Sequence, residues 1–62
     1  MSSTLTLVTY KKVGRSYGVN IYDVIYHYSN GDMAHERHED DTMGDIQFMC
    51  DGMNVKFVEA VE

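Results

Sequence analysis

The chain has 62 residues, a single cysteine and a formal net charge of −5 at pH 7. A chain of this length is expected to form one domain with a small core. A single cysteine excludes an intrachain disulfide. The sequence has no run of about 18 apolar residues, so no transmembrane helix is expected. All ten acidic residues lie at or beyond Asp23, which argues against direct binding to a nucleic-acid backbone, because such binding needs clustered cations.

Three segments with alternating or β-branched residues predict strands. Residues 4–10 form the first, and two glycines interrupt the pattern at 11–18. Residues 19–28 are apolar on both faces, which indicates a strand that is central in its sheet or covered on both sides. Asn30-Gly31 predicts a two-residue hairpin turn of type I′, and the polar segment 33–39 returns as a strand at an edge or at a working surface.

A short helix is expected next. Thr42 followed by Asp45 fits a capping box, so residues 43–51 are predicted to be helical, with Gly52 as the C-terminal stop. Residues 55–61 alternate and predict a last strand. Projected at about 100° per residue, five apolar residues share one helix face and Phe48 lies nearly opposite. The five are Met43, Ile46, Met49, Cys50 and Met53.

The order of segments predicts the α+β class. We expect a single domain over residues 1–62, built from a small three- to four-stranded antiparallel sheet with one short α-helix packed on one face. Residues 1–18 form either an additional strand or a flexible arm. Because one sheet covers only one side of the helix, the other side is expected to contact a partner, and so small a chain is expected to be homodimeric.

Three residues with metal-binding or nucleophilic chemistry lie in the second half of the chain. His35 and His38 point to opposite faces of a strand, so no metal site is expected there. Cys50 is expected to be a small apolar helix residue, because no oxyanion hole or pocket accompanies it. We therefore expect no enzyme, no metal and no cofactor. A small metal-binding domain that uses these three residues is an alternative.

Carboxylates gather around the start of the predicted helix. Favourable interaction with the helix dipole explains Asp41 and Asp45. It does not explain Glu36 and Glu39, which lie on the polar strand. Carboxylates spaced along an edge are able to imitate a row of phosphates for a DNA-binding enzyme. Stacking of single-stranded nucleic acid on the tyrosines is opposed by the net charge.

Four short motifs follow one another in a suggestive order. They are Tyr22-Asp23-Val24, Asn30-Gly31, Glu36-Arg37-His38 and Thr42-x-x-Asp45. In this order and spacing, the chain resembles the small uracil-DNA glycosylase inhibitors of short-tailed Bacillus phages. The register runs without a gap from Gly31 to Cys50, the last strand falls at 53–61, and residues 1–18 are only loosely placed. The family reads Glu-Tyr-His at the third motif and begins the fourth with serine.

The resemblance implies a DNA-mimicking homodimer. In the family, a three-stranded antiparallel sheet carries one helix, the helices meet at the dimer interface, and an apolar cavity receives a leucine side chain from the DNA-binding loop of the enzyme. Carboxylates beside the cavity replace the DNA phosphates. The family's strand glutamate falls on Glu36, its helix phenylalanine on Ile46 and its helix tyrosine on Cys50, so both aromatic positions are changed here.

We therefore expect a non-enzymatic inhibitor that blocks the DNA-binding face of uracil-DNA glycosylase in the host cytoplasm, through an apolar groove between dimer helices and flanking carboxylates. The alternative within the same class is a DNA mimic directed at another DNA-handling host enzyme, such as a restriction or recombination nuclease. No direct contact with nucleic acid or a membrane is expected. The expected partner-binding residues are Glu36, Glu39, Asp40, Met43, Asp45, Ile46, Met49, Cys50 and Met53.

Overall fold

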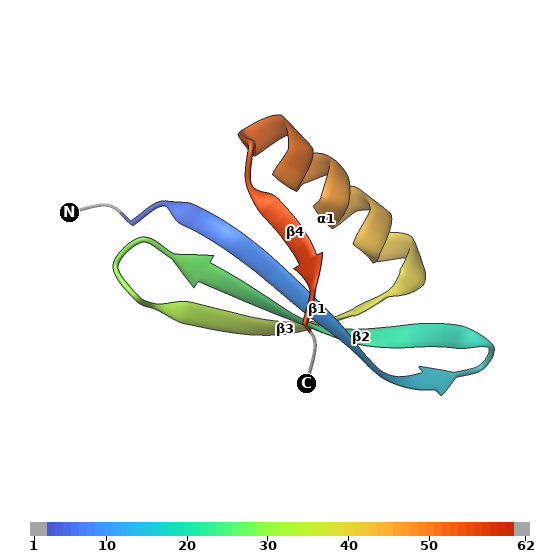
Figure 1. The fold of residues 1–62 in the computed structure, drawn as a ribbon. Coiled ribbons are helices and arrows are strands. Elements are labelled where there is room, and N and C mark those ends of the chain that lie inside the picture. Colours follow the sequence, from blue (N-terminus) through green and yellow to red (C-terminus); the bar gives the residue numbers. More distant parts are fainter. Residues whose placement is uncertain (1–2, 61–62) are drawn as a thin grey trace.

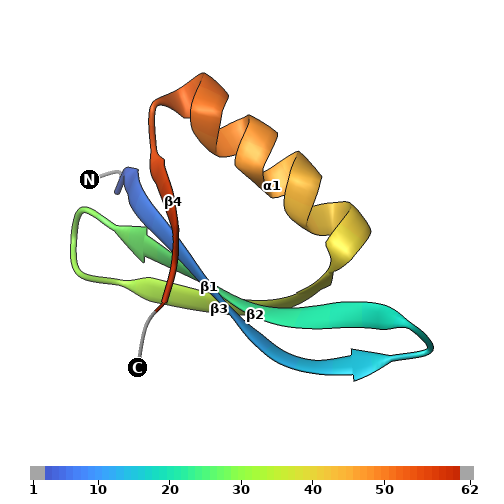
Figure 2. The same cartoon turned by 45° about the vertical axis from the view of Figure 1, so that its right-hand side comes forward.

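The computed structural model describes residues 3–60 (Figure 1). This part of the chain forms four strands and one helix, and the strands make one sheet in the spatial order β3-β2-β1-β4. The helix α1 lies across one face of the sheet (Figure 2). The α+β class and the helix on one face are thus confirmed. The bounds are Leu5–Ser16 for β1, Val19–Tyr28 for β2, Met33–Glu39 for β3, Asp40–Met53 for α1 and Lys56–Glu59 for β4.

β2 is a central strand that pairs antiparallel with both β1 and β3. This position confirms the expected central place of 19–28 and the edge place of β3. β1 is longer than the predicted strand, because a register shift between Lys12 and Gly14 keeps the chain in the sheet. Tyr17 and Gly18, with φ of 51° and 79°, make the turn to β2.

The β2–β3 connection is a hairpin, but its turn differs from the predicted one. Asp32 donates its backbone N–H to the side-chain oxygen of Asn30 at 3.0 Å, and the Gly31 N–H is 3.0 Å from the carbonyl of Tyr28. A type I′ turn requires positive φ at both central residues. Gly31 has a φ of 91°, whereas Asn30 is not among the described residues with positive φ. The prediction of a two-residue type I′ turn is therefore wrong.

The expectation of an antiparallel sheet is also wrong, because β4 pairs parallel with β1, from Leu7 against Lys56 to Tyr10 against Glu59. β3 is antiparallel to β2, which is antiparallel to β1, so β3 and β1 run in the same direction. The chain leaves β3, returns along α1 and re-enters the sheet at the far edge in that same direction (Figure 1). Such a crossover connects parallel strands, so the sheet is mixed.

α1 begins and ends outside the predicted limits of 43–51. Its N-cap is Glu39, which makes no side-chain cap hydrogen bond, so the capping box expected at Thr42 is not formed. Asp40 instead lies in the first turn, and its carboxylate accepts the backbone N–H of Asn20 at 3.3 Å. Gly52 lies inside the helix, which stops at Asn54 in the left-handed conformation. The described part of the chain contains no helix that is long and apolar enough to cross a membrane.

The core lies between α1 and the sheet. Val8 of β1 and Val24 of β2 meet Ile46 and Cys50 of α1, and all four are buried. The ring of Tyr10 stacks on Phe57 of β4, with centroids 4.6 Å apart. This contact joins the edge strand to the core. Further half-buried residues around the four are Leu5, Tyr26, Met43 and Val55.

The opposite face of the sheet is not covered by any element within residues 3–60 (Figures 1 and 2). We call it the open sheet face. Because Val24 faces α1 and side chains alternate along a strand, Ile25 faces the other way, together with its register partners Thr9 and His35. The middle of the open sheet face is formed by Leu7, Thr9, Ile25, Met33, His35 and Val58.

Candidate protein-binding surface

α1 exposes a large aromatic side chain on the side that faces away from the sheet. Phe48 is 81% exposed. Ile46 and Cys50 turn toward the sheet, and at about 100° per residue Phe48 therefore points away from it. Met49 and Met53 are also exposed on this helix. Several exposed apolar side chains on one short helix indicate a contact surface.

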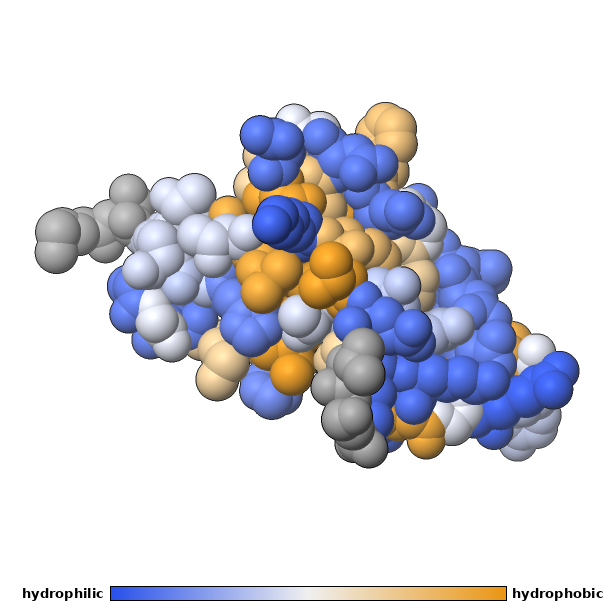
Figure 3. Space-filling view, viewed as in Figure 1, coloured by the Kyte–Doolittle hydropathy of each residue, from blue (hydrophilic) through white to orange (hydrophobic). Residues whose placement is uncertain are grey.

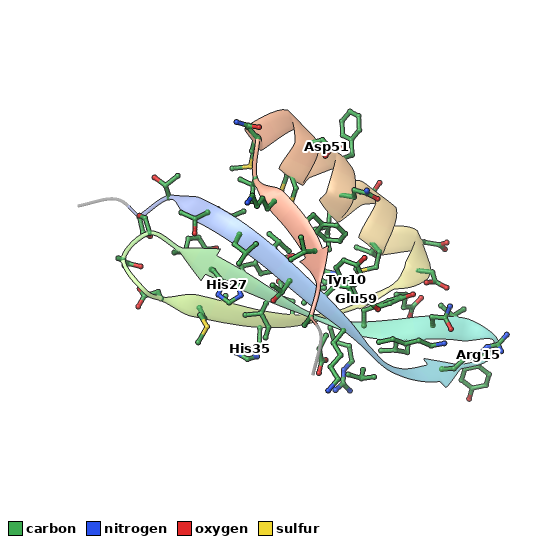
Figure 4. All side chains as sticks on the ribbon, in the orientation of Figure 1. Tyr10, Arg15, His27, His35, Asp51 and Glu59 are labelled. Atoms are coloured by element: carbon green, nitrogen blue, oxygen red, sulfur yellow. The ribbon has the colours of Figure 1, made fainter. Side chains whose placement is uncertain are left out.

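Carboxylates flank this aromatic residue. Asp45 and Asp51 lie three residues before and after Phe48, a spacing that makes them its neighbours on a helix surface. Asp51 is on α1 and far from His27 and His35, which lie on the other side of the sheet (Figure 4). The helix contains no basic residue. We call this surface the outer helix face and define it as Asp41, Asp45, Phe48 and Asp51. Met49 and Met53 are exposed on the flank of α1, between this face and the sheet.

Two glycines leave the ring of Phe48 uncrowded. Gly44 and Gly52 lie four residues before and after it, and a Cβ built at either position meets no atom within 4 Å. Nothing within residues 3–60 therefore requires glycine at these two places. Glycine inside a helix costs roughly 0.5–1 kcal/mol relative to alanine. This cost is understandable if a partner approaches the helix closely on both sides of Phe48.

Glu36 forms a small polar cluster with His38 and Tyr26. Its register partner is Val24, so Glu36 lies on the α1 side of the sheet. The Nε2 atom of His38 is 3.1 Å from a Glu36 carboxylate oxygen and 3.4 Å from the Tyr26 hydroxyl. Hydrogen bonding by His38, and then by Tyr26, holds the pKa of Glu36 below its ordinary value. Partial burial and the Glu36 carboxylate raise the pKa of Tyr26 to about 12. Glu36 is therefore negatively charged at neutral pH.

The open sheet face carries charges of both signs, whereas the exposed side of α1 carries carboxylates only. By register, Lys11, Arg37 and Lys56 belong to the open sheet face, where the carboxylate of Asp23 is 3.2 Å from Arg37. Arg15 lies at the distal end of the β1–β2 hairpin (Figure 4). The outer helix face, in contrast, combines the aromatic ring of Phe48 with carboxylates and carries no basic side chain. It therefore has the charge needed to bind a basic partner.

The five apolar helix residues expected on one face divide into two groups. Ile46 and Cys50 lie in the core, with Met43 half-buried beside them, whereas Met49 and Met53 are exposed. The predicted acids, which are Glu36, Glu39, Asp40 and Asp45, are all exposed. Phe48 was not among the predicted partner-binding residues, although the helical projection already set it apart from the other apolar residues.

The residues that the structure describes form no pocket, so the apolar cavity implied by the resemblance is not present in a single chain. No group of three or more metal-binding side chains occurs within residues 3–60. His35 lies on the open sheet face and His38 on the α1 side, as the strand pattern predicts. Burial raises the pKa of the Cys50 thiol, which keeps it protonated in the core.

Comparison of the chain with family models, with curated proteins and with solved structures finds no match. The resemblance to the glycosylase inhibitors therefore rests on the sequence motifs and their spacing alone.

Proposed function

We propose that this protein is a non-enzymatic, DNA-mimicking inhibitor that occupies the DNA-binding face of uracil-DNA glycosylase in the host cytoplasm and functions as a homodimer. The observation that carries the proposal is the outer helix face, where exposed Phe48 lies between carboxylates while Lys11, Arg37 and Lys56 belong to the opposite side of the sheet. The sequence motifs are the reason for proposing uracil-DNA glycosylase as the target. The acidic and aromatic surface supports binding in place of DNA.

The chemistry of this surface matches that of an enzyme that flips bases. A glycosylase binds the DNA backbone through basic and polar groups, and its apolar wedge enters the base stack. Carboxylates of the outer helix face are suited to meet the basic groups. Met49 and Met53, one helical turn apart, add an exposed apolar strip on the flank of α1, about 100–140° around the helix axis from Phe48, on which an aliphatic wedge is able to pack.

The two kinds of residue have different effects on binding. Burial of Phe48 and the methionines lowers the dissociation rate, whereas the carboxylates mainly raise the association rate, and they do so less at high salt. Ile46 and Cys50 contribute indirectly, since their burial against the sheet fixes the rotation of α1 and thereby the direction of Phe48.

A uracil-excision assay with a labelled oligonucleotide and a bacterial uracil-DNA glycosylase tests the proposal. The wild-type protein is expected to inhibit stoichiometrically, and added enzyme is expected to restore excision. Phe48→Ala is expected to weaken inhibition by about tenfold or more, as at an interface hot spot. Tyr17→Ala is the matched control, because Tyr17 is a fully exposed aromatic residue on the distant β1–β2 turn. Folded wild-type protein that does not inhibit would refute the proposal.

A second candidate is a DNA mimic that inhibits another DNA-handling host enzyme. It is favoured by the replacement of both family aromatic positions by Ile46 and Cys50, which lie in the core here. The same acidic surface serves either enzyme. Capture of a nuclease from host lysate by the wild-type protein, and not by Phe48→Ala, together with no effect on uracil excision, would select this candidate.

A further inference from the structure

The open sheet face brings together three side chains that are able to bind a metal ion. His27 lies on β2, and Met33 and His35 lie on β3. His27 and Met33 are register partners, and His35 follows Met33 by two residues, so all three project on the same side of the sheet. Both histidines lie on this side in Figure 4. Figure 3 shows apolar and hydrophilic atoms side by side along the underside of the molecule, where this face lies.

The pairing of β2 with β3 sets these side chains close to one another. The Tyr28 N–H donates to the Asp32 carbonyl at 3.0 Å, which makes these two residues a hydrogen-bonded pair. Two kinds of pair alternate along an antiparallel ladder, so His27 and Met33 form a pair of the other kind, in which the side chains are closer. Opposite Cβ atoms are about 4.5–5.5 Å apart, and those of diagonal neighbours such as His27 and His35 are about 7–8 Å apart at most. Metal-to-ligand bonds of about 2.0–2.3 Å allow two imidazoles and a thioether to meet one ion across such spans.

A hydrogen bond to β1 orients the ring of His27. Its Nε2 atom is 3.2 Å from the hydroxyl oxygen of Thr9. When Nε2 carries the proton and donates it to this oxygen, Nδ1 keeps a lone pair for a metal ion. Histidines that bind metals commonly donate their other ring N–H to an oxygen acceptor, which fixes the tautomer and the direction of the ring. His35 makes no hydrogen bond or ion pair within residues 3–60, so its ring nitrogens are available to a ligand.

The chemistry of the three donors favours monovalent copper. A thioether is a soft ligand that selects Cu(I), and imidazole also binds copper. Harder cations prefer oxygen ligands, and the carboxylate of Asp23 on this face is already paired with Arg37 at 3.2 Å. Histidine, cysteine and carboxylate side chains alone form no group of three within residues 3–60, so the thioether of Met33 is essential to the site. Met33 is 59% exposed, which gives an ion from solution access to its sulfur.

We propose that His27, Met33 and His35 form a binding site for Cu(I) on the open sheet face. The ion bridges β2 and the edge strand β3 beside their hairpin turn, and it is bound by two imidazole nitrogens and one thioether sulfur. This set differs from the metal-binding alternative considered for the sequence, because His38 lies on the α1 side of the sheet and Cys50 lies in the core. The site lies on the other side of the sheet from the outer helix face, so copper binding does not depend on the inhibited enzyme.

Titration of the purified full chain with Cu(I) tests the site, with ascorbate keeping the copper reduced under anaerobic conditions and a chromophoric chelator as competitor. The wild type is expected to bind one ion per chain. Met33→Leu, which removes the sulfur and keeps a side chain of similar volume, is expected to weaken binding about tenfold or more, and so is His35→Gln. Both residues are exposed, so both variants are expected to fold, which circular dichroism checks. His38→Gln is the matched control on the same strand and is expected to bind copper like the wild type.

NMR spectroscopy locates the bound ion, because Cu(I) is diamagnetic. Its addition is expected to shift the methyl signal of Met33 and the ring C–H signals of His27 and His35, and to leave those of His38 unchanged. A folded wild type that binds no Cu(I) would overturn the proposal. So would binding that keeps its full affinity in either Met33→Leu or His35→Gln, or that shifts the signals of Cys50 in place of these three residues, because the ion would then lie elsewhere.

Discussion

Ile46 and Phe48 are two residues apart on α1, and we expect their substitutions to have opposite effects on stability and inhibition. Ile46 is 6% exposed and Phe48 is 81% exposed. Ile46→Val removes one buried methylene group, which costs about 0.5–1.5 kcal/mol in the free energy of unfolding. A domain of this size has a total of roughly 3–9 kcal/mol, so the loss is measurable without unfolding the protein. Each kcal/mol corresponds to about 4–8 °C in the melting temperature.

Phe48→Ala, in contrast, removes a side chain that makes few contacts within the chain, so we expect a change within about 0.5 kcal/mol. Its effect should appear in the excision assay, where about 2 kcal/mol of lost contact corresponds to roughly 30-fold weaker inhibition. Thermal unfolding followed by circular dichroism, together with inhibition measured well below the melting temperature, separates the two effects. The assignment of the helix faces would be refuted if Ile46→Val weakened inhibition without lowering the melting temperature while Phe48→Ala lowered it.

Three further predictions follow from the polar cluster and the core. The pKa of Glu36 is lowered in the folded state. Its contribution to stability is therefore complete above the ordinary pKa of 4.5 and is lost as the pH falls through the lowered pKa. The urea midpoints of the wild type and of Glu36→Gln should differ at neutral pH and converge at low pH. The pKa of Tyr26 is raised from 10.0 to about 12. Its contribution to stability is therefore complete below pH 10.0 and is lost as the pH rises through about 12. In an ultraviolet titration, the wild type should show a late tyrosinate transition that is absent from Tyr26→Phe. Cys50 should react with a thiol reagent only as fast as the core opens, and rapid labelling of the folded protein would contradict its burial.

The strand order near β2 could be predicted because the pattern of apolar and polar residues in a strand depends on its place in the sheet. A strand apolar on both faces is typical of a central position, and the polar segment 33–39 is typical of an edge. The direction of β4 could not be predicted in this way. Four residues, Lys56–Glu59, have the same pattern in a parallel or an antiparallel strand, and the crossover of α1 sets their direction.

The sequence pattern could not predict where α1 begins and ends. It also could not predict which of the apolar residues of α1 are buried and which are exposed. Thr42 and Asp45 have capping-box spacing, yet Asp40 and Asp41 already provide the acidic first turn. Met49 and Met53 share a broad apolar arc with Ile46, but the sheet contacts only part of that arc, and where its contact ends depends on the packing of Val8 and Val24.

The unequal lengths of the first and last strands have a consequence for solubility. β4 pairs with β1 only from Leu7 to Tyr10, so the backbone of β1 from Lys11 to Ser16 has no strand on that side among the described residues. An open strand edge is a template for aggregation with other chains. Here the edge carries Lys11, Lys12 and Arg15 and is bent by the irregularity before Gly14. Positive side chains and a bulge both hinder edge-to-edge association, so we expect the basic N-terminal segment of this acidic protein to lower the tendency of this edge to pair with other chains.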